Sequence, residues 1–83
     1  MNLVELTEYL VNTLVQTPAD VTLAESNEDM NVIEVRVAEE EIGAVIGRGG
    51  KLANSIRTIV QAAAYTNNQG KVRINIDING THL

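Results

Sequence analysis

Five consecutive residues, Gly47-Arg48-Gly49-Gly50-Lys51, combine glycines and cations in a pattern that suits a bound anion. Three glycines in four positions let the backbone adopt conformations closed to other residues, and they remove side chains that would hold a ligand away from the backbone N–H groups. A helix beginning at Lys51 would point its unpaired N–H groups and the positive end of its dipole into the same space. Lys51 in a first helical turn costs about 0.3–1 kcal/mol at an exposed site, and a bound anion would offset this cost. The alternative is that the glycines only turn the chain sharply between two helices.

Two nucleotide-binding motifs can be tested against this loop, and both fail. A Walker A loop, G-x-x-x-x-G-K-[ST], would place Val45 at its first glycine and Leu52 where Ser or Thr must hold magnesium. The dinucleotide fingerprint G-x-G-x-x-G, begun at Gly47, requires a glycine at Leu52 and a strand before the loop, where we expect a helix. We therefore do not expect an ATPase or a dehydrogenase.

Apolar spacing predicts three helices around this loop. Aliphatic residues at three-to-four spacing predict a helix over residues 2–16, which Thr17-Pro18 ends because the residue before proline disfavours helix. Three glutamates at residues 39–41 favour the start of a short second helix over residues 39–46, since acids in a first turn complement the dipole. A third helix is predicted over residues 51–66, with an apolar stripe formed by Leu52, Ile56, Ile59, Val60 and Ala63.

Alternation of apolar and polar residues predicts three strands. The first contains Val21 and Leu23, and turn-forming residues 26–31 separate it from the second. The second and third strands are marked by alternating aliphatic residues at positions 33, 35 and 37 and at positions 72, 74, 76 and 78. The order α-β-β-α-α-β predicts a single α+β domain over residues 1–83, with three helices packed on one face of a three-stranded sheet.

Charge is distributed unevenly along the chain. The net charge is −5, but residues 1–41 carry −9 and residues 42–83 carry +4. This asymmetry suggests that one surface faces an anion while the other stays solvated, although chance in a short chain is the alternative. In the basic half, Arg57, Lys71 and Arg73 could each add a phosphate contact or could be solvated charges of a surface.

Composition argues against several classes of protein. Cysteine is absent and His82 is the only histidine, so we expect no disulfide, no metal site and no cofactor, and we interpret the glutamates at 39–41 as a solvated helix start. The N-terminus lacks the features of a signal peptide, and no stretch has the roughly 20 apolar residues of a membrane span. We expect a cytoplasmic protein that is not an enzyme.

The pattern that remains is G-x-x-G, formed by residues 47–50, preceded by Val45-Ile46 and placed between two helices in an α-β-β-α-α-β order. It resembles the KH domain of the bacterial type (type II), in which this loop clamps the backbone of about four single-stranded nucleotides. The chain length and the stretch "IGAVIGRGGKLANSIRTIVQAAA" are similar to the small stand-alone KH proteins of the KhpA type. Ile56 occupies the family's second aliphatic position after the loop, whereas Ala53 is smaller than the residue usual at the first.

This resemblance implies a binding site for single-stranded RNA. Loop N–H groups would meet phosphates, a flanking cation would assist them, and bases would lie in an apolar groove between the two central helices and a neighbouring strand. The residues implied are Gly47, Arg48, Gly49 and Gly50 for the backbone, Lys51 as the cation, and Ile46 and Ala53 near the bases.

The resemblance also implies partners and a cellular role. It implies a homodimer, or pairing with a larger KH-containing protein of the Jag type, and a role in post-transcriptional control and in cell-envelope growth or division. An alternative function is a protein-interaction subunit with weak affinity for RNA. We interpret Tyr9 and Tyr65, the only aromatic residues apart from His82, as packing residues rather than stacking platforms.

Overall fold

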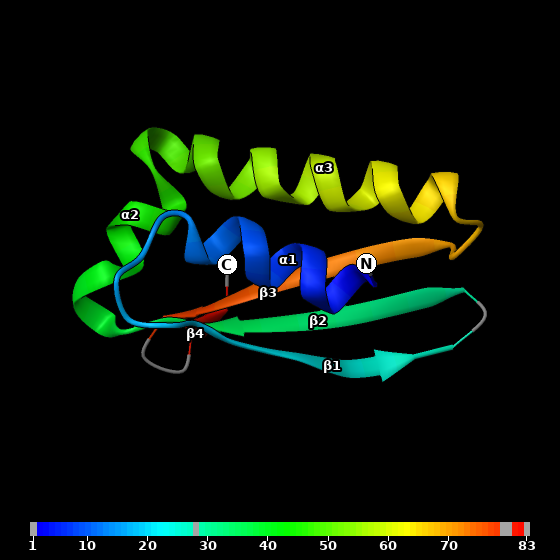
Figure 1. Ribbon diagram of the computed structural model, residues 1–83, viewed down its shortest axis with the longest axis horizontal. Coiled ribbons are helices and arrows are strands. Elements are labelled where there is room, and N and C mark those ends of the chain that lie inside the picture. Colours follow the sequence, from blue (N-terminus) through cyan, green and yellow to red (C-terminus); the bar gives the residue numbers. More distant parts are fainter. Residues whose placement is uncertain (1, 28, 79–80, 83) are drawn as a thin grey trace.

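The computed structural model describes residues 2–27, 29–78 and 81–82, in which three helices cover one face of a sheet (Figure 1). The predicted α+β class and the order of the three helices and first three strands are confirmed, and a short strand, β4, is added at the end. The elements are α1 (Leu3–Asn12), β1 (Asp20–Ser26), β2 (Met30–Arg36), η1 (Glu39–Glu41), α2 (Ile42–Ile46), η2 (Arg48–Gly50), α3 (Lys51–Thr66), β3 (Lys71–Ile78) and β4 (Thr81–His82), where η marks a single 3₁₀ turn.

The sheet has the order β1-β2-β3-β4. β1 and β2 form an antiparallel hairpin, β2 and β3 run parallel, and β4 pairs antiparallel with β3 at Asp77 and Ile78. A parallel pair needs a crossover connection, and here α2 and α3 provide it. The glycine loop, residues 47–51, therefore lies in the middle of the crossover, where α2 meets α3 (Figure 1).

The core lies between the helices and the apolar face of the sheet. Register places Ile33 opposite Ile74 and Val35 opposite Ile76, so branched side chains from neighbouring strands meet on that face. The helices cover this face with buried residues, among them Val11 of α1 and Val60 of α3.

Among the described helices, none is long and apolar enough to cross a membrane.

The apolar stripe predicted on α3 is only partly the side that faces the core. Ile56 and Val60 are buried as predicted, but Leu52 is 40% exposed and Ile59 is 47% exposed. Two small residues, Ala53 and Ala64, are buried instead, together with Ile56 and Val60. The helix is therefore rotated so that two large aliphatic side chains face outward.

Helix α1 is shorter than the predicted range of residues 2–16. It begins with a capping box between Asn2 and Glu5 and ends at Asn12. The side-chain carbonyl of Asn12 accepts a hydrogen bond from the Ala19 backbone N–H at 2.8 Å, which ties the end of the helix to the start of β1. Leu14 and Val15 still pack against the core although they are not helical. Their burial explains why apolar spacing extended the predicted helix.

The predicted second helix is divided into η1 and α2, and Glu41 lies at the junction. Its carboxylate accepts hydrogen bonds from the backbone N–H groups of Gln16, at 2.5 Å, and Thr17, at 3.0 Å. These bonds hold the segment after α1 against the base of α2, and they lower the pKa of Glu41 below its usual value of 4.5, with the Gln16 bond the largest cause.

In the described part of the chain no group of acids or histidines is arranged to hold a metal.

We expect the stability of the protein to fall in acid through Glu41. Because the folded-state pKa of this carboxyl is lowered, its contribution is complete above pH 4.5 and is lost as the pH falls through the folded-state pKa. Urea unfolding at pH 7 and pH 3 should show a larger loss for the wild type than for Glu41→Gln. Glu40→Gln is the matched control, because the neighbouring Glu40 is exposed. Equal losses in the wild type and Glu41→Gln would contradict the assignment.

Candidate functional site

The three glycines of the loop all have backbone conformations that other residues rarely adopt. The φ angles are 73° at Gly47, 65° at Gly49 and 80° at Gly50. Positive φ at three positions explains why glycine is needed for the turn between α2 and α3. At Gly49 an added Cβ would meet no atom within 4 Å, so the backbone there faces open space. The loop thus combines a sharp turn with a backbone that a ligand can approach.

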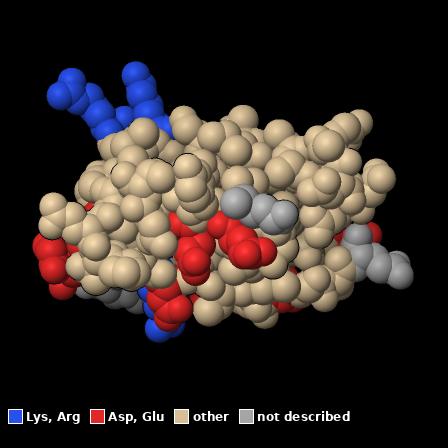
Figure 2. All heavy atoms as spheres, viewed as in Figure 1, with Lys and Arg blue, Asp and Glu red and all other residues tan. Residues whose placement is uncertain are grey.

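The N-terminus of α3 opens onto this loop without a side-chain cap. Its N-cap residue is Gly50, in the left-handed conformation, and no side-chain capping hydrogen bond forms there among the described residues. Arg48 and Lys51 are both exposed beside it. Lys and Arg side chains project from the end of the molecule where α2 meets α3 (Figure 2). The helix dipole, the uncapped N–H groups and two cations therefore favour an anion at the same place.

Of the two residues predicted to lie near the bases, Ile46 lies beside the glycine loop and Ala53 lies in the core. Ile46, the last residue of α2, is half-buried and precedes the glycine loop directly. Ala53 is only 2% exposed and belongs to the core cluster on the inner side of α3. The structure therefore brings residues 46–51 together at the junction of the helices, whereas Ala53 supports α3 from beneath and offers almost no surface.

A groove runs between α3 and β3, whereas the family resemblance implied a groove between the two central helices and a neighbouring strand; no residue of α2 is among those that line it. It collects Arg57, Lys71 and Arg73, which were identified only as separate cations, and among the described residues that line it Asp29 is the one acid. The other residues that line the groove were not predicted. Polar residues spaced four apart on α3 and alternating polar residues on β3 could have indicated that these two surfaces face each other. The lining is Asp29, Met30, Arg57, Thr58, Gln61, Ala62, Tyr65, Thr66, Asn68, Gly70, Lys71, Val72, Arg73, Ile74 and Asn75.

Side chains of α3 cover the edge of β3 inside this groove. The Gln61 amide donates to the Gly70 carbonyl at 3.2 Å and accepts from the Val72 N–H at 2.8 Å, much as a neighbouring strand would. Arg57 donates from Nε to the Ile74 carbonyl at 3.3 Å. Because exposed strand edges pair readily with other chains, these bonds protect the edge and fix the width of the groove.

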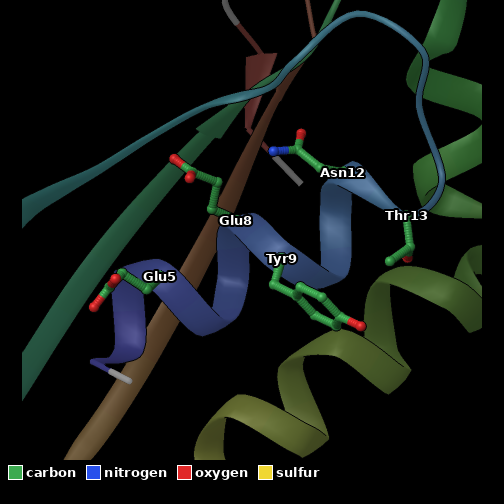
Figure 3. Close-up of a pocket in the computed structure, with 5 residues that line it drawn as sticks. All are labelled: Glu5, Glu8, Tyr9, Asn12 and Thr13. Carbon is green, nitrogen blue, oxygen red and sulfur yellow. The ribbon is translucent and has the colours of Figure 1, made fainter.

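Acidic side chains gather on a different surface, over α1. Figure 3 shows Glu5 and Glu8 projecting from one side of α1, while Tyr9 lies toward α3; all three line a shallow pocket with Asn12 and Thr13. Acidic side chains also lie over α1 in the space-filling view, away from the cations at the junction of α2 and α3 (Figure 2). This surface would repel the anion that the glycine loop favours.

The interpretation of both tyrosines as packing residues is wrong. Tyr9 is 61% exposed and Tyr65 is 83% exposed. Neither ring belongs to the hydrophobic core, so packing in the core does not account for either residue. Tyr65 lies in the groove along α3, and Tyr9 lies on the acidic surface of α1.

Comparison with known proteins identifies relatives across most of the chain. The family model "KhpA/KhpB, KH domain" matches residues 4–76. The chain is 41% identical over 66 residues to the RNA-binding protein KhpA of Clostridium perfringens, covering 78% of this chain and 88% of that protein. It is 35% identical over 78 residues to the RNA-binding protein KhpA of Borreliella burgdorferi, covering 93% and 92%. The corresponding protein of Treponema pallidum is 39% identical over 62 residues, covering 74% and 78%. No solved structure gives a significant match.

Proposed function

Because the chain belongs to the KhpA/KhpB family of KH domains, we propose that it binds single-stranded RNA through the loop formed by Gly47, Arg48, Gly49 and Gly50. The observation that carries this proposal is the open glycine backbone at the uncapped N-terminus of α3, with two exposed cations beside it. Relatives that cover most of the chain are named RNA-binding proteins, which supports the same ligand. The proposed role is binding rather than catalysis.

The proposed contacts follow from the geometry of the loop. Backbone N–H groups approach a phosphate without hindrance, and Arg48 and Lys51 neutralise its charge. Ile46 contributes an apolar surface beside the phosphate site, and bases enter the groove along α3. Ala53 acts from the core by letting α3 lie close to the sheet. With few cations and a net charge of −5, we expect modest affinity.

A second candidate function, as a protein-interaction subunit, is favoured by the outward side of α3. Leu52 and Ile59 are large aliphatic side chains that α3 leaves 40% and 47% exposed. Burying such side chains against a second copy, or against a larger KH-containing protein of the Jag type, would release them from water. Both functions are compatible, since the glycine loop and this aliphatic surface use different residues.

We further propose that the protein acts in the cytoplasm, in post-transcriptional control, with an effect on cell-envelope growth or division.

An NMR titration of labelled protein with a pool of short random single-stranded RNA tests the proposed function. We expect shifts at residues 46–51 and along the side of α3 that lines the groove. The logarithm of the binding constant should fall with the logarithm of salt by about 0.7 per phosphate contact. Absence of shifts near millimolar RNA, with the protein folded, would overturn RNA binding. Concentration-dependent broadening at Leu52 and Ile59 without RNA would then support the interaction subunit.

A further inference from the structure

We propose that Tyr65 is a stacking platform for a base of RNA that runs along α3 beyond the glycine loop. This inference rests on the proposed RNA binding and adds a second contact point at the opposite end of the helix. Tyr65 lies in the last turn of α3, and the glycine loop precedes the first turn. It is the most exposed large apolar side chain among the described residues, at 83%.

Helical periodicity places Tyr65 in a row with two residues that already face β3. Arg57, Gln61 and Tyr65 are spaced i, i+4 and i+8, which puts them on one side of α3. Arg57 bonds the Ile74 carbonyl, and Gln61 bonds Val72 and Gly70, so the first two members of the row are held by the edge of β3. Tyr65 is one turn farther along α3, near the end at which β3 begins with Lys71, and its side chain is largely exposed. The ring therefore remains open at the end of the groove.

The charge of the groove complements a nucleic-acid backbone. Arg57, Lys71 and Arg73 line it together with Tyr65, and Asp29 is the one acid in the part of the lining that the structure describes. Cations beside an exposed aromatic ring are the combination that proteins use to hold single strands, because phosphates pair with the cations while bases stack on the ring. Other lining residues include Thr58, Thr66 and Asn68, which are polar. The lining also contains apolar residues, among them Met30 and Ile74, so the groove offers apolar surface to bases as well as cations to phosphates.

The length of α3 sets the length of RNA that can reach both contact points. Lys51–Thr66 contains 16 residues, and at a rise of 1.5 Å per residue the helix is about 24 Å long. A KH loop clamps about four nucleotides, so an oligonucleotide of that length occupies the loop and the adjoining part of the groove without reaching Tyr65. A longer oligonucleotide, of about eight nucleotides, is needed to continue along the groove to Tyr65.

The test compares pools of random RNA of four and eight nucleotides, measured by fluorescence anisotropy. We expect Tyr65→Ala to weaken binding of the longer pool by about 5-fold to 100-fold, the usual effect of removing a stacking ring, and to leave the shorter pool unchanged. Tyr65→Phe, which keeps the ring, should restore affinity. Tyr9→Ala is the matched control, because Tyr9 is also exposed but lies outside the groove.

A spectroscopic measurement separates stacking from an indirect structural effect. The chain has two tyrosines and no tryptophan, so Tyr65 is the only fluorophore in a Tyr9→Phe protein. Its emission, corrected for RNA absorbance, should be quenched by the longer pool only. Normal binding of both pools by Tyr65→Ala would overturn the stacking proposal and leave loop binding intact. No binding of either pool by the wild type would overturn both. Loss of self-association in Tyr65→Ala, with RNA affinity unchanged, would assign the ring to a protein contact instead.

Discussion

Replacing Arg48 and Gly49 together by aspartate is expected to abolish RNA binding while the protein stays folded. The two carboxylates would stand where the phosphate is proposed to sit, and like charges forced together cost several kcal/mol, which corresponds to a loss of about 100-fold or more in affinity. Arg48 is exposed, and a Cβ at Gly49 meets no atom within 4 Å. At φ 65° and ψ 20° Gly49 is in the left-handed region, which aspartate tolerates at about 1 kcal/mol.

The matched control for this variant is Arg48→Asn with Gly49→Asn. Asparagine has the shape of aspartate and a similar tolerance of left-handed backbone, so the two variants differ in charge alone. Anisotropy titrations should be made in about 0.15 M salt, where screening over about 8 Å limits the influence of charges elsewhere on the protein. Thermal unfolding should give similar midpoints for both variants. If the aspartate variant keeps wild-type affinity, the phosphate site lies outside the glycine loop.

The position of the glycine loop could be predicted from sequence because its cause is local. Glycine adopts positive φ angles most readily, and three of them occur within four residues, so the turn is visible in the residue types themselves. The same holds for α3, whose predicted range of residues 51–66 is confirmed. Glycines precede it, and after its end Asn68 and Gly70 both have positive φ, so both boundaries are set by residues suited to that backbone.

The side of α3 that faces the core could not be predicted from sequence, because packing on the sheet decides it. Leu52 and Ile59 look like core residues by type, yet Ala53 and Ala64 are the ones buried. Small side chains let α3 approach the sheet closely, and the larger ones are then turned outward. Periodicity identifies where apolar residues recur but does not identify which stripe is covered. The aliphatic surface proposed for a protein partner is a consequence of this rotation.

The groove depends on contacts between residues far apart in the chain. Gln61 and Arg57 fix the spacing of α3 and β3 through backbone groups of residues 70, 72 and 74, and only the folded structure brings these together. The exposure of Tyr65 has the same origin, because it depends on where β3 begins relative to the end of α3. Residue types alone could suggest cations and an aromatic ring, but not that they share one surface.

Substituting Gly47 by alanine is expected to destabilise the fold more than any other single change in the loop. Its φ of 73° and ψ of −178° lie in a region that is essentially restricted to glycine. An added Cβ would lie 2.7 Å from Leu52 Cγ and 3.0 Å from Leu52 Cβ. Backbone strain and overpacking together should reduce the free energy of unfolding by about 3 kcal/mol, measured by urea denaturation.

Two further variants separate the steric cause from the backbone cause. Gly49→Ala has a positive φ but no nearby atom, so it should cost about 1 kcal/mol. In a double-mutant cycle, Leu52→Ala should restore part of the loss in Gly47→Ala, because it removes the Cγ atom that the new methyl group meets. Strain at residue 47 would remain, so recovery should be incomplete. Equal destabilisation by Gly47→Ala and Gly49→Ala would show that the contact with Leu52 relaxes at no cost. The loop would then tolerate a side chain at position 47 as readily as at position 49.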